Sequence, residues 1–280
     1  MSLTHIFKDH SAFVQLVLFA GILLSLWFAE VLLSVHQAKL KWQHGGLNLL
    51  FILTAVPVQL GMTLLVLSVS QWVTVHHWGI LFLFKGNTFV KYLLGFLLLD
   101  FFEYVYHVIM HKVHWLWRFH LIHHSDHEVD VSTTIREHPG ETFVRVCFLC
   151  LWVFLSGATF GLLVLRQTIQ TVSNISAHTH LHLPEKTAKV IGWLLITPNL
   201  HHVHHHNELP YTDCNFGDVL SIWDRLFDTY REKKKAAIHY GIDVFKVSKS
   251  TGFFLLMAAP FSKRKFKTEG EKQNGRKDYG

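Results

Sequence analysis

Charged residues are scarce in this chain. Asp, Glu, Lys and Arg make up 16% of the 280 residues, whereas hydrophobic residues make up 50%. A typical soluble domain carries about 25% charged residues. The scarcity of charge therefore disfavours a soluble globular protein and indicates an integral membrane protein.

Cysteine is also rare. Three cysteines are too few for the disulfide framework of a small secreted domain. Cys147 and Cys150 form a C-x-x-C pair, but this pair lies inside the apolar run 143–155 and has no second pair nearby. Free cysteine packs well in apolar surroundings, so structural filling is favoured over zinc binding or redox work.

The net charge of +6 comes from the carboxyl-terminal tail. From Arg231 onward the chain has 13 Lys and Arg against 5 Asp and Glu, and the remainder is slightly acidic. A basic tail next to membrane segments is explained by anionic lipid headgroups or by retention in the cytoplasm. No DNA- or RNA-binding pattern is present, and no nucleic-acid partner is expected.

Three long apolar runs, 11–35, 47–75 and 88–110, are each long enough to cross a bilayer. Lys39, Lys41 and the basic tail favour the cytoplasmic side. The amino terminus would then lie outside, and three crossings would bring His107 to the cytoplasmic face.

A fourth apolar stretch, 142–171, is long for one crossing and short for two. A single crossing would separate the histidines before it from those after it. We therefore expect a broken or re-entrant hairpin that turns near Ser156 and Gly157. The predicted fold is an all-α integral membrane protein with three to four spanning or re-entrant helices and a His-rich cytoplasmic cap.

Sixteen of the 23 histidines fall between positions 107 and 206, and they form two HxxxH and two HxxHH patterns. Helical residues three and four apart share a face, so each pattern presents its imidazoles together. Ten imidazoles suit two metal ions with five nitrogens each, and imidazole accommodates Zn, Cu, Fe or Ni. The candidate ligands are His107, His111, His120, His123, His124, His178, His182, His201, His204 and His205.

Other interpretations of these residues are weaker. Isolated histidines at a membrane edge would be ordinary capping residues, and an HExxH zinc hydrolase is disfavoured because no Glu follows His107 or His178. His202 and His206 offer another reading frame, but the spacing to the Asp213 block favours His201. Six carboxylates could orient ligating imidazoles: Asp100, Glu103, Asp126, Glu141, Asp213 and Asp224.

Four sequence blocks resemble the fatty acid hydroxylase/sterol desaturase superfamily over residues 90–230. They read Asp100-x-x-x-Tyr104-x-x-His107-x-x-x-His111, Trp117-x-Phe119-His120-x-x-His123-His124-Ser125, Arg136-x-His138-Pro139-x-Glu141, and Thr197-Pro198-x-x-His201-x-x-His204-His205. The spacing from His111 to His120 and the closing Trp223-Asp224-Arg225 block look most like the alkylglycerol-monooxygenase side. This chain departs from the pattern at Val108, where the family often has Arg, and at Lys112, where that branch has Glu.

The resemblance implies a non-haem di-iron oxygenase that uses O₂ to hydroxylate or desaturate an unactivated C–H bond of a lipid or sterol. Its ten ligands would be the histidines named above, with two Fe ions as the working metals and Zn as a possible substitute after purification. No G-x-G-x-x-G motif occurs, so electrons would come from a separate electron-transfer protein or reductant. The implied organisation is membrane helices at 1–87, a catalytic domain at 88–230 and a basic cytoplasmic tail at 231–280.

Two functions of other classes remain open from the residues alone. A divalent-metal transporter would place ligands at mid-membrane in repeated halves, and a His-rich metal-binding protein would bind metal without consuming O₂. Either a bacterial inner membrane or an endoplasmic reticulum fits the sequence, with the histidines facing the cytoplasm.

Overall fold

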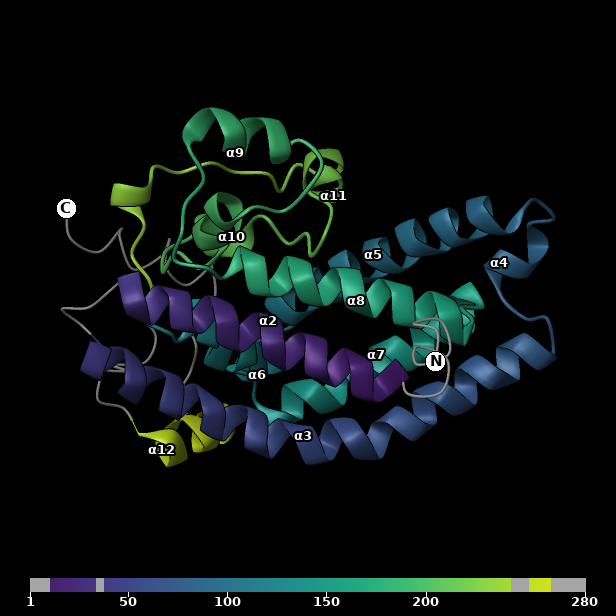
Figure 1. Ribbon diagram of the computed structural model, residues 1–280, viewed down its shortest axis with the longest axis horizontal. Coiled ribbons are helices and arrows are strands. Elements are labelled where there is room, and N and C mark those ends of the chain that lie inside the picture. The colour runs from purple at the N-terminus through teal and green to yellow at the C-terminus, as the bar shows by residue number, and fades with distance from the viewer. Residues whose placement is uncertain (1–10, 34–37, 243–251, 263–280) are drawn as a thin grey trace, which may run out of the picture.

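The computed structural model describes residues 11–33, 38–242 and 252–262, and helices are the only regular elements among them apart from one isolated bridge, Leu195–Leu220. The long helices run lengthwise through the molecule, and most of the short helices lie toward the left and the top of the view, whereas the short helix at 80–83 lies at the right-hand end (Figure 1). The α-helices are α2 (Ser11–Leu33), α3 (Ala38–Val75), α4 (Ile80–Leu83), α5 (Thr88–Lys112), α6 (His114–His124), α7 (Pro139–Ser156), α8 (Phe160–Ala177), α9 (Glu185–Ile191), α10 (Pro198–His204), α11 (Ile222–Leu226) and α12 (Phe253–Ala258).

Three stretches of the described residues are long and apolar enough to cross a membrane: Lys41–Leu83, Thr88–Lys112 and Pro139–Ser156. The predicted span 47–75 lies inside α3, which continues through Pro57 without a break. The predicted span 88–110 corresponds to α5, and α2 covers the first predicted span as far as Leu33. The all-helical membrane fold expected from the sequence is confirmed.

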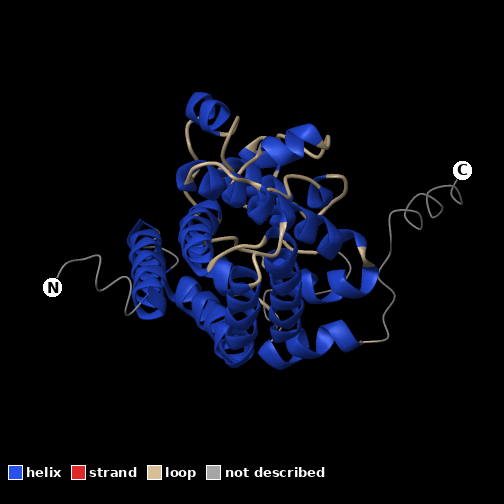
Figure 2. Ribbon diagram, turned by 90° about the vertical axis from the view of Figure 1, so that its right-hand side faces the viewer, coloured by secondary structure: helices blue, strands red, loops and turns tan. Residues whose placement is uncertain are grey.

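The segment 142–171 forms the expected hairpin. Helix α7 ends at Ser156, and Gly157 adopts the left-handed conformation with φ 75°. A Cβ atom at Gly157 would lie 2.4 Å from the carbonyl oxygen of Trp78, so the tip of the hairpin packs directly on the turn after α3. Helix α8 then returns alongside the other long helices (Figures 1 and 2). The hairpin thus brings both ends of the histidine-rich region to the same end of the molecule.

The long helices carry apolar side chains on their outer surfaces as well as between them. On α3, Leu53 and Leu64 are 60% and 70% exposed, whereas Val73 is buried. Helix α3 packs along α7, and one core joins Leu99, Val146 and Leu162 from three different helices. A protein with apolar side chains on both sides of its helices suits a lipid environment.

Buried carboxylates attach the segment after α10 to the long helices. Asp100 on α5 accepts hydrogen bonds from the backbone N–H groups of Val219 and Leu220 and from Trp223 Nε1, at 3.2, 3.3 and 2.8 Å. Asp224 accepts from the N–H groups of Phe216 and Gly217. These bonds satisfy buried backbone donors in a segment without regular structure.

The short apolar segment near the carboxyl end forms α12 and a following 3₁₀ turn, Ala259–Phe261. It packs on α3 and α6 through Leu256 and Ala259, while Phe254 stays 85% exposed. Of the predicted basic tail, residues 243–251 and 263–280 lie outside the described residues.

Candidate metal centre

Nine of the ten predicted ligands converge into two groups whose nitrogen atoms lie within 4.8 Å of one another in each group. The first group is His107, His111, His120, His124 and His204. The second group is His123, His178, His201 and His205.

The first group combines three helices. His107 and His111 lie one turn apart on α5, His120 and His124 lie one turn apart on α6, and His204 ends α10. The Nε2 atoms of His107 and His120 are 3.2 Å apart. Two nitrogens bound to one ion at about 2.1 Å take similar separations.

The second group has one residue from α6, one from the end of α8 and two from α10 and its cap. His178 Nε2 lies 3.1 Å from His123 Nε2 and 2.9 Å from His201 Nε2. His205 Nε2 lies 3.2 Å from His201 Nε2. Four ring nitrogens therefore point at a common centre.

Backbone carbonyl groups orient several of these rings through the other ring nitrogen. The Nδ1 atoms of His107, His178 and His204 donate to the carbonyl oxygens of Phe216, Asn174 and Cys214, at 2.9, 2.8 and 2.7 Å. Such bonds set the tautomer and leave the Nε2 lone pair for a metal.

Two carboxylates orient rings of the first group. Glu141 Oε1 lies 2.5 Å from His120 Nδ1, and Asp213 Oδ1 lies 3.2 Å from His111 Nδ1. Asp213 also accepts from Lys112 Nζ at 2.7 Å. Lys112 replaces the Glu of the alkylglycerol-monooxygenase pattern, and here its ammonium holds an orienting carboxylate.

The surroundings keep the imidazoles neutral. Burial lowers the pKa of His120 and His178 to about 4, and it also lowers the pKa of His123 and His201 well below the ordinary value. A neutral imidazole is the form that binds metal.

Several ligand nitrogens are buried and have no hydrogen-bond partner. They include His111 Nε2, His204 Nε2 and both nitrogens of His124. Buried polar atoms are normally paired, and unpaired ones signal a missing ligand or ion. The two groups therefore fit two metal ions.

The structure leaves His182 outside both groups. Its ring lies 4.6 Å from the ring of His202, and its Nδ1 donates to the carbonyl oxygen of His180. Helix α8 ends at Ala177 and His178 is its C-cap, so no helix continues to His182 and the i, i+4 relationship assumed for these two histidines does not hold.

The contacts after Pro198 distinguish His201 and His205, which belong to the second group, from His202 and His206, which do not. His201 joins the second group, whereas His202 Nδ1 lies 2.5 Å from Tyr240 Oη. His206 Nδ1 accepts from the N–H of His239. His138 caps α7 by accepting from the N–H of Gly140.

Of the six carboxylates proposed to orient ligands, Glu141 and Asp213 contact ligand rings. Asp224 acts one step away, because it fixes the peptide N–H of Phe216, whose carbonyl accepts from His107. Asp126 instead pairs with His44 at 2.7 Å, and Glu103 pairs with Arg166 at 2.7 Å. Sequence patterns missed His44, because nothing near it in sequence marks its contact with a loop 82 positions away.

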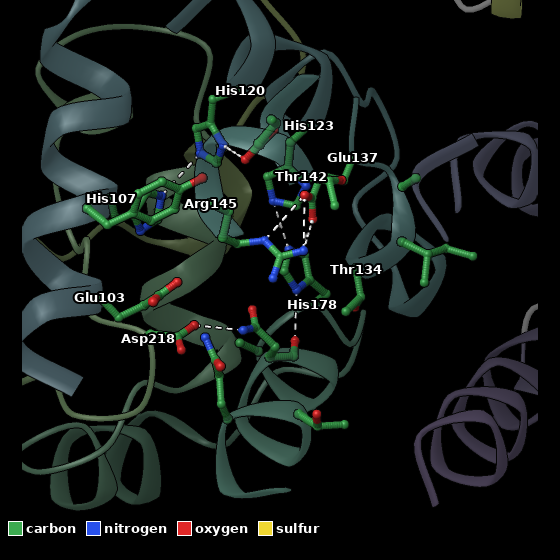
Figure 3. A pocket seen from close by; sticks show the side chains of 18 of the residues that line it. Glu103, His107, His120, His123, Thr134, Glu137, Thr142, Arg145, His178 and Asp218 are labelled. Carbon is green, nitrogen blue, oxygen red and sulfur yellow. Dashed lines mark hydrogen bonds and ion pairs between the residues drawn. The ribbon is translucent and has the colours of Figure 1, made fainter. Parts of the chain in front are cut away.

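A pocket of about 270 Å³ opens onto both histidine groups (Figure 3). His107 and His120 of the first group and His123, His178 and His201 of the second line it. Arg145, Glu137 and Asp218 lie on its other sides (Figure 3). The pocket therefore gives access to both histidine groups.

The fold and the site together define a membrane-helical protein with two adjacent all-imidazole groups beside a pocket, each able to hold a metal ion. The sequence pattern of the fatty acid hydroxylase family matches residues 92–229, and this part of the chain is similar to that family. The match ends just before Tyr230, and it contains all nine converging histidines.

Relatives with known activities are lipid and sterol oxygenases. The chain is 30% identical to an ornithine lipid hydroxylase of Rhizobium tropici over 172 residues, which is 61% of this chain and 50% of the relative. It is 29% identical to an alkylglycerol monooxygenase of Xenopus tropicalis over 153 residues, 53% of this chain and 32% of the relative. It is 26% identical to the cholesterol 25-hydroxylase of Homo sapiens over 136 residues, 48% of this chain and 49% of the relative.

The chain thus spans half or less of the length of these relatives. No solved structure matches it.

Proposed function

We propose that this protein is a membrane di-iron oxygenase that hydroxylates a C–H bond of a lipid. The observation that carries the proposal is the convergence of nine imidazoles, seven of them buried and two half-buried, into two adjacent groups that share one pocket. The family match and the lipid hydroxylases among the relatives support it.

The reaction consumes one O₂ and two electrons for each product. The substrate C–H bond becomes C–OH, and the second oxygen atom leaves as water after taking up two protons. Two iron ions held by the histidine groups would supply the O₂ chemistry. The electrons come from a separate carrier. Desaturation of the same C–H position uses the same number of electrons and adds no oxygen to the lipid.

The protein's own residues hold and shield this chemistry. Phe216, Asn174 and Cys214 fix ligand rings through their carbonyl oxygens, and Glu141 and Asp213 do so through carboxylates. Burial of the rings keeps bulk water away from the reacting centre.

We further propose that the histidine end faces the cytoplasm, in a bacterial inner membrane or an endoplasmic reticulum. Lys41 and the basic tail favour that side. We also propose that residues 88–230 are the catalytic part. Helix α3 contributes Ile52 and Gln59 to the pocket, so the catalytic part works only with the amino-terminal helices in place.

The test compares lipids from cells that express the wild type with lipids from cells that express His120→Ala. Mass spectrometry of total lipids, with iron supplied, should show a gain of one oxygen only with the wild type. His180→Ala is the matched control, because His180 lies outside both groups and its side chain is exposed. No lipid difference between the wild type and His120→Ala would refute the oxygenase.

A metal transporter is not favoured. Its ligands would sit at mid-membrane in broken helices of two repeated halves. Here the histidines lie at the end of α5, on α6, at the end of α8 and on α10, and no repeated halves are seen among the described helices (Figure 1).

A further inference from the structure

Helix α8 presents a polar stripe to the pocket. Gln167, Gln170, Thr171 and Asn174 all line it, and their spacing of i, i+3, i+4 and i+7 places them on one face of the helix. This stripe is the reason that α8, unlike α7, is not apolar enough to count as a membrane span. The amide side chains of this helix, which packs among the membrane-spanning helices, lie along the wall of the pocket.

The opposite wall adds to this polarity. Gln59 on α3 receives a hydrogen bond from Arg145 on α7 at 3.2 Å, and Arg145 also pairs with Glu137. The saturated chain of a fatty acid offers no partner to such groups, and burying unpaired amides costs free energy. The wall therefore suits a hydrogen-bonding part of a lipid.

Acidic side chains outnumber Lys and Arg side chains along the pocket. Glu103, Glu137, Glu141 and Asp218 line it, and Arg145 is its one lining Lys or Arg among the described residues. Glu103 forms a salt bridge with Arg166, and Glu137 forms one with Arg145. Glu141 and Asp218 form no salt bridge with Lys or Arg in the described part of the chain.

These two carboxylates each keep one oxygen without a partner. Glu141 is 4% exposed, and its Oε2 has no hydrogen-bond partner, while its Oε1 contacts His120. Asp218 Oδ1 accepts from Asn174 Nδ2 at 2.7 Å, whereas its Oδ2 is buried and unpaired. Two unpaired carboxylate oxygens beside the cavity favour a cationic hydrogen-bond donor.

Resting on the proposed function, we infer that the substrate is a lipid that carries a protonated amine in its headgroup, and that Asp218 with the α8 stripe holds this ammonium in the pocket. The headgroup end then lies next to His107, His120 and His178, and the oxidised carbon belongs to the polar part of the lipid. The volume of about 270 Å³ lies near the lower limit of ligand pockets, which suits a headgroup better than a whole lipid.

The charge of Asp218 could instead only balance the charge of the two metals. This role predicts that loss of the carboxylate weakens metal binding and affects all substrates equally. A role in recognising an ammonium predicts a loss that depends on the amine of the ligand.

The test uses the full-length, metal-loaded protein in detergent and two probes with the same chain. One probe is N-dodecanoyl-1,4-diaminobutane, which has a free ammonium, and the other is its N′-acetyl derivative, which has none. Wild type should bind the amine probe at least about tenfold more tightly, the size of one charge-assisted hydrogen bond. Asp218→Asn should remove most of this preference while the acetyl probe binds as before and the metal content stays at the wild-type level.

Asp228→Asn is the matched control, because Asp228 is 95% exposed and pairs only with the surface residue Arg231. Equal affinity of the wild type for both probes overturns the inference. So does an Asp218→Asn variant that loses both probes, or its metal, in parallel.

Fragmentation of the oxygenated lipid gives an independent readout. An added oxygen in the amine-bearing headgroup fragment supports the inference, and an added oxygen in the acyl chain overturns it while leaving the oxygenase intact. If no lipid gains oxygen, the proposed function fails, and the binding preference alone then decides whether the ammonium site exists.

Discussion

The two histidine groups lie side by side but are built differently. The first has five imidazoles, and two of its rings contact carboxylates, Glu141 and Asp213. The second has four imidazoles, and the carbonyl of Asn174 orients His178. Three of the four rings in the second group line the pocket, against two of five in the first. We therefore expect the first group to bind an ion more firmly, and the second to present more of its rings to the pocket.

Removing one ligand from each group should have the largest effect. His201→Ala leaves three imidazoles in the second group, whereas His204→Ala leaves four in the first. Both variants should lose lipid oxygenation by more than about 100-fold, which exceeds the usual effect of an outer-sphere partner. Metal analysis should show a more complete loss of one ion in His201→Ala. Equal metal loss in the two variants would contradict the comparison, and His180→Ala should keep both ions.

Acid should affect both groups alike. His120 in the first group and His178 in the second both have a pKa of about 4 in the folded chain, below the ordinary value of 6.5. The unfolded chain therefore binds more protons than the folded one between pH 6.5 and pH 4. The free energy of unfolding of the metal-free protein therefore has its full value above pH 6.5. It falls as the pH drops through that window, by on the order of 3 kcal/mol for each imidazole. Thermal unfolding in detergent after chelation, measured between pH 7.5 and 5, checks this expectation. A melting temperature that does not change with pH would contradict it.

Replacing the orienting carboxylate Glu141 should weaken metal binding in the first group and leave the second group unchanged. Glu141→Gln keeps the shape of the side chain but weakens its bond to His120, so the first group should bind metal about 10–100-fold more weakly. The second group should keep its affinity, because Glu141 contacts none of its rings in the described structure. Competition with a chelator measures both affinities. Glu185→Gln, in an exposed surface pair with Lys189, is the control.

The smallest effect is expected at Lys112. Its Nζ lies 2.7 Å from Asp213, but the lysine side chain is 51% exposed, and exposed ion pairs contribute about 0–1 kcal/mol. Lys112→Met should therefore change the metal affinity of the first group by no more than about fivefold. A loss as large as that of Glu141→Gln would mean that Lys112 positions Asp213 much more strongly than its exposure indicates.

Much of the fold followed from the chain alone. Apolar runs placed α3 and α5, and the need to reunite the histidines placed a turn at Gly157, which the structure confirms. The HxxxH and HxxHH spacings identified nine residues that converge, because helical periodicity of 3.6 residues is a local property.

Periodicity failed where the helix ended. His182 matched the spacing of a ligand, but α8 stops at Ala177, so His182 points elsewhere. The polar stripe of α8 has the same helical spacing and could have been noticed, since four polar residues within an apolar stretch mark a lined cavity.

The amino-acid sequence by itself determined the membrane character, the helical hairpin and the supply of imidazoles, because hydropathy and helical spacing are properties of neighbouring residues. Tertiary structure decided how the imidazoles divide into groups of five and four, and which atoms fix their tautomers. The carbonyl groups of Phe216 and Cys214 and the side chains of Glu141 and Asp218 come from distant positions, and any residue type has a carbonyl. Only the packing of the long helices brings the two carbonyl groups to the rings of His107 and His204 and the two carboxylates to the wall of the pocket.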